Sequence, residues 1–236
     1  MQPGLTSRLM KPGQGPGVAN RTSFLFQINV TRRCQLRCSH CYILSDKKDK
    51  SPDMTEDEFL HVVKGIVDHM KKDFEFARRY TFVDIHVIGG EPSMLGVDFF
   101  KSALPKAKAM LEQIPQEVAF SIVTNLVTAE ALSVARLFDK VATSYERSTR
   151  FNKVKQEEIW RSNVRTLMAE SKNPGVSGPK DFSVTTALVR PVVQAGAASM
   201  IEELVELGFT KMHFGFFIPS GDGDLNSKLV QPKHSE

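Results

Sequence analysis

Three cysteines lie close together in this chain, Cys34, Cys38 and Cys41, and they are the only cysteines in its 236 residues. A structural zinc site takes four ligands and closes its coordination shell, which three thiolates alone do not do. A four-iron cubane that receives three thiolates keeps one iron open to a small molecule. An odd number of neighbouring cysteines does not suit disulfides and is typical of a reducing compartment. The spacing therefore predicts an iron–sulfur cluster with an open iron, and a zinc knuckle or a part of one is the alternative.

A second group of residues, Gly89-Gly90-Glu91-Pro92, follows an apolar segment about fifty positions after the cysteines. Two glycines at the end of a strand allow the backbone to approach a ligand closely. A buried glutamate beside them can accept hydrogen bonds from an ammonium group. The same residues are common in ordinary turns, so the tetrapeptide alone does not distinguish a binding site from a turn.

The composition is typical of one globular domain, because 41% of the residues are hydrophobic and 25% are charged. The net charge of +4 is mild and spread along the chain, so we expect no nucleic acid partner. No apolar run is long enough to cross a membrane, and the first residues lack the order of a signal peptide. We expect a cytoplasmic protein with a flexible N-terminal arm rich in Gly and Pro at residues 1–23, a core domain at 24–218 and a polar C-terminal tail at 219–236.

Hydrophobic periodicity predicts strands that alternate with helices along the core domain. Thr55 and Glu58 form a capping box at the start of the first helix. The alternation predicts an α/β fold with a parallel sheet, and six strands are too few for the closed eight-stranded barrel. The expected strands span residues 24–30, 80–88, 117–123, 140–144, 182–189 and 210–218, and the expected helices span residues 55–72, 97–114, 128–138, 154–171 and 197–207.

The polar candidates of this chain follow the expected strands. The cysteines come after the first strand, the Gly-Gly-Glu-Pro group after the second, Thr124 and Asn125 after the third, and Ser144 at the end of the fourth. Ligands of parallel α/β sheets lie at the carboxyl ends of the strands. We therefore expect these residues to gather at one edge of the sheet.

The spacing Cys-x3-Cys-x2-Cys with Tyr42 directly after it, the preceding residues 26–33 and the Gly-Gly-Glu-Pro group together resemble the radical S-adenosylmethionine (radical SAM) superfamily, over about residues 24–218. The resemblance implies a partial (β/α)6 TIM-like open barrel of parallel strands. It also implies one [4Fe-4S] cluster on the three cysteines, with S-adenosyl-L-methionine on the open iron. In that family the reduced cluster cleaves S-adenosylmethionine to a 5'-deoxyadenosyl radical, which takes a hydrogen atom from the substrate.

The resemblance further implies contacts to S-adenosylmethionine at the strand ends. Tyr42 is expected to stack near the adenine, with a role in the core as the alternative. Ser144 is expected at the ribose or the carboxylate, and Arg150 at the carboxylate unless it is a surface arginine. The full expected set of cofactor-binding residues is Tyr42, Gly89, Gly90, Glu91, Pro92, Thr124, Asn125, Ser144, Arg150 and Leu188.

Four other polar residues carry weaker expectations. His40 lies between the second and third cysteines but is not expected to be a ligand, and His86 and His213 are expected to be hydrogen-bonded core histidines. Glu146 stands where the family commonly has an aspartate, which makes the assignments around Ser144 and Arg150 less firm.

The first and fourth strands resemble the peptide- and protein-modifying branch of the family, but no cysteine after Cys41 is present to hold further clusters. No sixth helix is expected over the last strand, so we expect the tail from Pro219 or a partner protein to cover that side. The predicted function is that of an oxidoreductase which abstracts hydrogen from a peptide, protein or natural-product intermediate, with an electron donor such as flavodoxin or ferredoxin. The alternatives are a radical-type methyltransferase, a nucleoside-modifying enzyme, and a non-catalytic Fe-S or zinc-binding module.

Overall fold

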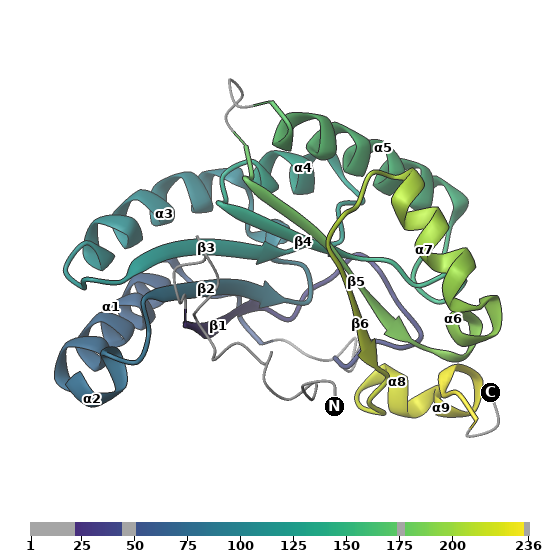
Figure 1. The fold of residues 1–236 in the computed structure, drawn as a ribbon, viewed down its shortest axis with the longest axis horizontal. Coiled ribbons are helices and arrows are strands. Elements are labelled where there is room, and N and C mark those ends of the chain that lie inside the picture. Colours follow the sequence, from purple (N-terminus) through teal and green to yellow (C-terminus); the bar gives the residue numbers. More distant parts are fainter. Residues whose placement is uncertain (1–21, 44–50, 174–177, 234–236) are drawn as a thin grey trace, which may run out of the picture.

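The computed structural model describes residues 22–43, 51–173 and 178–233, and its centre is a sheet of six parallel strands. Figure 1 shows that this sheet curls into a half-barrel. The fold is therefore the predicted α/β partial barrel. The strands lie side by side in the order of the sequence: β1 (Ser23–Thr31), β2 (Phe82–Gly89), β3 (Glu117–Val123), β4 (Lys140–Ser144), β5 (Asp181–Leu188) and β6 (Met212–Phe216).

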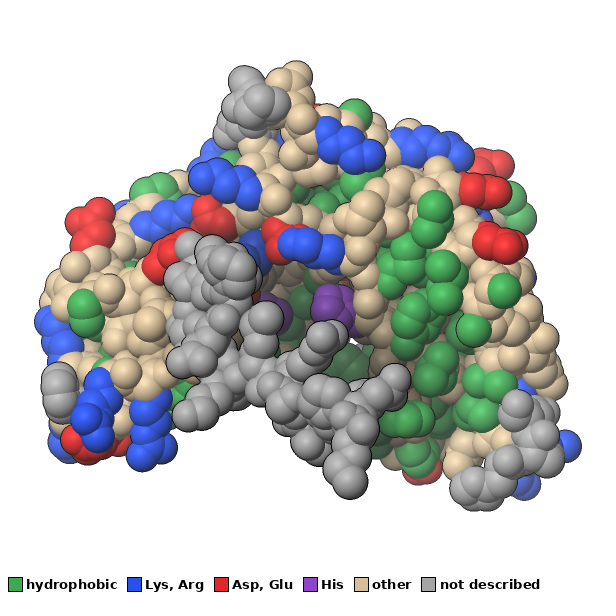
Figure 2. Space-filling view, in the orientation of Figure 1, with side chains coloured by type: hydrophobic (Ala, Val, Ile, Leu, Met, Phe, Trp, Pro, Cys, Tyr) green, Lys and Arg blue, Asp and Glu red, His purple; other side chains and the backbone are tan. Residues whose placement is uncertain are grey.

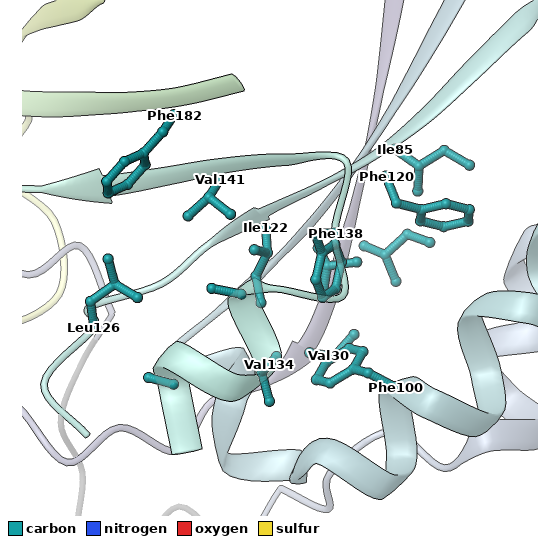
Figure 3. Close-up of a cluster of buried hydrophobic side chains, with 14 of the residues drawn as sticks. Val30, Ile85, Phe100, Phe120, Ile122, Leu126, Val134, Phe138, Val141 and Phe182 are labelled. Carbon is teal, nitrogen blue, oxygen red and sulfur yellow. The ribbon is translucent and has the colours of Figure 1, made fainter. Parts of the chain in front are cut away.

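The hydrophobic core lies between the convex face of the sheet and the helices that cover it (Figure 1). Figure 3 shows part of this layer, in which Phe100 and Val134 from two helices lie with Ile85 and Ile122 from two strands, all fully buried. Burying a side chain of this size contributes about 1.5–3 kcal/mol. The longer helices are α1 (Glu56–Lys72), α3 (Val97–Leu111), α4 (Ala129–Ala135), α5 (Val154–Ser171) and α7 (Ala197–Glu206).

Helix α1 begins where the sequence predicts it. The Thr55 hydroxyl accepts a hydrogen bond from the Glu58 N–H at 3.3 Å, and the Glu58 carboxylate accepts one from the Thr55 N–H at 2.7 Å. The capping box is thus confirmed, and a cap of this kind contributes about 1 kcal/mol to helix stability. The helix packs against the sheet because its apolar residues recur on one face: Phe59, Val63, Ile66, Val67 and Met70.

The strands at residues 117–123 and 140–144 and the helix at 154–171 have the predicted bounds, and the other long elements differ by a few residues at their ends. The sequence did not predict several short helices, because one turn has too few apolar positions to show a period. These are α2 (Phe74–Ala77), η2 (Pro92–Leu95), α6 (Arg190–Ala195), α8 (Asp222–Leu225) and α9 (Ser227–Val230).

The last strand has little cover on its outer face, since Phe214 is 41% exposed and Phe216 is 88% exposed. The chain after it, expected to carry no periodic pattern, forms α8 and α9 below the barrel (Figure 1). The Gly223 N–H donates to the Cys41 carbonyl at 2.8 Å, so the tail is tied to the cysteine loop.

The predicted flexible arm lies almost entirely outside the described residues, which begin at 22, and Ser23 already belongs to β1. Within the described ranges of the chain, every helix is too short or too polar to cross a lipid bilayer.

Candidate functional site

The cysteine loop follows β1 at the carboxyl edge of the sheet, and main-chain hydrogen bonds hold it in place. The Ser39 N–H donates to the Thr149 carbonyl at 3.1 Å, and the Cys41 N–H donates to the Cys38 carbonyl at 3.1 Å. All three cysteines are free thiols that are partly exposed. The loop is therefore joined to the end of the sheet on one side and to the tail on the other.

Burial raises the pKa of all three thiols, and for Cys38 it raises the pKa to about 12. Each sulfur also lies close enough to another for their charges to interact, because Cys38 is affected by both Cys34 and Cys41. Without a metal group the pocket thus favours protonated thiols, and a metal group has to displace those protons on binding. The three half-buried sulfurs belong to one loop, and their charges interact with one another. This arrangement fits a cluster that is held by three cysteines.

A single metal ion fits less well. Among the described residues, no three His, Cys, Asp or Glu side chains converge as the ligands of one ion would. A four-iron cluster does not require that convergence, because each cysteine sulfur binds a different iron atom.

The two glycines of the Gly-Gly-Glu-Pro group lie against the chain that leads into the cysteines. A Cβ atom at Gly89 would be 2.3 Å from the Thr31 carbonyl oxygen, and one at Gly90 would be 2.3 Å from the Arg33 carbonyl oxygen. The Gly90 N–H donates to the Thr31 carbonyl at 2.8 Å. The predicted close approach is present, but the group that comes close is the protein's own backbone, and a ligand is not needed to explain the glycines.

Glu91 is 1% exposed and uses its carboxylate within the protein. The carboxylate accepts from the Ser93 N–H at 3.1 Å, the Thr124 hydroxyl at 2.7 Å and the Asn125 N–H at 2.6 Å. These hydrogen bonds join the ends of β2 and β3, and the binding of an ammonium group by this carboxylate stays a prediction. Pro92, also buried, begins η2 directly after it.

A second buried glutamate, Glu146, lies on the other side of the cysteine loop and is 2% exposed. Its carboxylate lies 3.2 Å from Arg150 Nη1 and 3.2 Å from His40 Nε2, and it accepts from the Ala187 N–H at 3.0 Å. Burial disfavours the charged carboxylate, but the hydrogen bond from His40 and the charge of Arg150 outweigh it and lower the pKa of Glu146.

Glu146 and His40 were not among the predicted site residues. The four-residue spacing of Glu146 and Arg150, and the place of His40 inside the loop, were the available signals. In the described residues, Arg150 Nε and His40 Nδ1 are buried without a hydrogen-bond partner. Arg150 is 8% exposed and is not a surface arginine. Two unpaired donors or acceptors beside the cysteines suit a polar ligand at this position.

The remaining predicted residues lie around this centre with fewer contacts. Ser144 is half-buried at the end of β4, and Leu188 is half-buried at the end of β5. Tyr42 is 58% exposed, so its ring is not part of the core.

The concave side of the barrel carries polar and charged groups. Asp84 lies 2.6 Å from Lys140 Nζ and 3.5 Å from His86 Nε2. Burial raises the pKa of Asp84, but hydrogen bonds from His86, Lys140 and Ser121 prevail and lower it to about 2. These residues and His213 line a cavity of about 190 Å³, and Figure 2 shows histidine side chains in this hollow. The expectation of two core histidines is wrong, because His86 is half-buried at the cavity and His213 is exposed.

No family model and no curated protein sequence matches this chain. Solved structures do match. The protein anSMEcpe with bound AdoMet has a TM-score of 0.63 and 15% identity over 84% of this chain and 52% of its own. The same protein with AdoMet and the Kp18Cys peptide has a TM-score of 0.61 and 17% identity over 83% and 51%.

SuiB from Streptococcus suis, bound to its precursor peptide SuiA, has a TM-score of 0.55 and 11% identity over 84% of this chain and 40% of its own. The chain therefore spans about half the length of these structures or less. At these identities the similarity establishes the fold, which is the curled half-barrel that anSMEcpe and SuiB also have.

Proposed function

We propose that this protein is a radical SAM enzyme. The observation that carries the proposal is the placement of Cys34, Cys38 and Cys41 in one loop at the carboxyl edge of a half-barrel whose structural neighbours were solved with AdoMet. When bound, a [4Fe-4S] cluster would supply the electron that splits S-adenosylmethionine and so generates the radical that takes hydrogen from a substrate.

The residues of the chain have separable tasks in this proposal. The three cysteines hold the cluster, and Glu146 fixes Arg150 and His40 beside it. Arg150 Nε, which is buried and unpaired in the described residues, is available to the carboxylate of S-adenosylmethionine.

The backbone of the Gly-Gly-Glu-Pro group faces the same edge, and the buried charge of Glu91 has no cationic partner among the described residues. The negative charge of Glu91 attracts the positively charged amino group of S-adenosylmethionine to this edge, and no direct hydrogen bond to the Glu91 carboxylate is required. Ser144, Leu188 and Tyr42 are assigned to the ribose and adenine.

A peptide is the substrate class that we propose. Both anSMEcpe and SuiB were solved with peptides bound. On the concave face of this barrel, Asp84, Lys140 and two histidines line one cavity. Such a polar lining suits a polar side chain or the main chain of a peptide. We further propose that the protein works in the cytoplasm, where its thiols stay reduced, with a flavodoxin or ferredoxin as electron donor.

The test is anaerobic reconstitution of the purified protein with iron and sulfide, followed by S-adenosylmethionine and dithionite. We expect about four irons and four sulfides per chain and formation of 5'-deoxyadenosine by chromatography. Changing any one of the three cysteines to alanine should abolish the visible absorbance and the product. Thr166→Ala should change neither, because the Thr166 hydroxyl donates to the Ser162 carbonyl within α5.

Stoichiometric zinc without iron would overturn the proposal in favour of a zinc-binding module. A cluster that yields no 5'-deoxyadenosine would indicate a non-catalytic Fe-S module. Transfer of a methyl group, or modification of a nucleoside in place of a peptide, would keep the superfamily and replace the reaction type.

A further inference from the structure

The side chain of Asn125, in the turn after β3, lies against the first cysteine of the loop. Its Nδ2 atom is 3.7 Å from Cys34 Sγ, within hydrogen-bond distance for sulfur, and the asparagine is 4% exposed. The Leu36 N–H also donates to this sulfur, at 3.4 Å. Cys34 thus receives one donor from its own loop and one from a distant strand end.

The orientation of the Asn125 amide is fixed by its neighbours. Its Oδ1 accepts from the Val127 N–H at 3.1 Å and from Gln35 Nε2 at 3.2 Å. A backbone N–H can only donate, so the oxygen must face Val127, and the NH2 group must then face the sulfur. The Asn125 N–H is held by the Glu91 carboxylate at 2.6 Å, which leaves the residue little freedom to turn away.

The three sulfurs differ in this respect. Cys38 Sγ faces the Arg150 carbonyl at 3.4 Å, and a carbonyl cannot donate. Cys41 has a hydrogen bond with the main chain at Ile43. Within the part of the chain that the structure describes, the side-chain amide at Cys34 therefore has no counterpart at the other two cysteines.

We propose that Asn125 is a positioning residue that sets the reduction potential of the bound cluster through its N–H···S bond to Cys34, and that Gln35 keeps its amide in the donating orientation. This inference rests on the proposed function. Reduction adds negative charge to a cluster and its sulfurs, so a donor to sulfur stabilises the reduced form and raises the potential. Loss of the donor makes the cluster harder to reduce.

The experiment measures the midpoint potential of the reconstituted full-length protein by an anaerobic titration followed with electron paramagnetic resonance. The main variant is Asn125→Ser, because a serine hydroxyl can still accept from the Val127 N–H but is too short to reach the sulfur. We expect its potential to shift to a more negative value. Asn125→Leu should shift it in the same direction, and Gln35→Leu should give a smaller shift of the same sign.

The matched control is Asn163→Ala. Asn163 is also a buried asparagine, and its amide donates to the Leu126 carbonyl at 2.9 Å and the Thr128 carbonyl at 3.1 Å in the same region, without touching a sulfur. This variant should lower the thermal midpoint of unfolding and leave the potential unchanged. The contrast separates a loss of packing from a loss of the hydrogen bond to sulfur.

A cluster-loaded Asn125→Ser variant with the wild-type potential would overturn the inference and leave the proposed function intact. A Ser variant that melts normally but takes up no iron would overturn it as well, because a bond to one sulfur should shift the potential without being needed to hold iron. Wild-type protein that takes up no iron would overturn the proposed function itself.

Discussion

Two buried glutamates lie on either side of the cysteine loop, and they are stabilised in different ways. Glu91 is held by donors that carry no charge, from Ser93, Thr124 and Asn125. Glu146 is held by Arg150 and His40, together with one main-chain N–H. Neutral donors satisfy the hydrogen bonds of a carboxylate but leave its charge in place, whereas a basic partner compensates the charge as well.

The difference indicates that Glu91 and Glu146 have different structural roles. Glu91 joins neighbouring strand ends and fixes Asn125, so it controls geometry around Cys34. The charge of Glu146 is compensated by that of Arg150. Through His40, Glu146 also connects the cysteine loop to the ends of β4 and β5. Removal of the carboxylate charge should therefore lower the free energy of unfolding more at Glu146 than at Glu91.

The largest effect is expected for Glu146→Gln. The change leaves the Arg150 guanidinium buried without its counter-charge, which typically costs about 3–5 kcal/mol. Urea unfolding measures the loss of free energy. The matched control is Glu170→Gln, since Glu170 pairs with Arg136 at a more exposed site where a loss of at most about 1 kcal/mol is expected. Equal losses in the two variants would contradict the comparison.

Gly90→Ala tests the close backbone packing next to Glu91. The new Cβ would lie 2.3 Å from the Arg33 carbonyl oxygen, so the chain leading into Cys34 has to move. We expect a loss of about 1–3 kcal/mol from overpacking, with lower iron content as well as weaker S-adenosylmethionine binding by calorimetry. Gly65→Ala is the control, because Gly65 is on the exposed face of α1 and nothing lies within 4 Å of its added Cβ, so this change should stabilise the protein. Full iron loading in Gly90→Ala would show that the strand end can shift without disturbing the cysteines.

Glu91→Gln should cost less than Glu146→Gln. One carboxylate oxygen becomes an NH2 group that faces a donor, and a lost buried hydrogen bond of this kind costs about 1–3 kcal/mol. The loss should show in urea unfolding at neutral pH. A loss larger than that of Glu146→Gln would reverse the order that the comparison predicts.

The smallest loss of stability is expected for Asp84→Asn. Asp84 lines the cavity, and its carboxylate has both charged and neutral hydrogen-bond donors. Its folded pKa of about 2 lies below its usual 3.8, so its stabilising contribution is present above pH 4 and is lost as the pH falls toward 2. Because the cavity is partly solvated, we expect a loss of about 1–2 kcal/mol at pH 7. The stability of wild type and variant should converge on acidification, and parallel curves between pH 4 and pH 2 would contradict the assignment.

Much of the fold could be predicted because its signals are local. The capping box at Thr55 and the apolar period of α5 each depend on residues a few positions apart, and both predicted elements are present. The short helices α8 and α9 were missed because single turns carry no period. His86 and His213 were misplaced because alternation along a strand shows that two faces differ, but not which face lines a cavity.

The sequence by itself determined the spacing of Cys34, Cys38 and Cys41 and the alternation of strands and helices, because both depend on residues that are close together in the chain. Only the tertiary structure decided what surrounds the cysteines. Glu91 and Asn125 are 34 positions apart, and Asn125 and Cys34 are 91 apart, yet each pair is hydrogen-bonded. The physical reason is that parallel strands bring their carboxyl ends to one edge, so contacts there depend on the curl and register of the whole sheet and not on any local pattern.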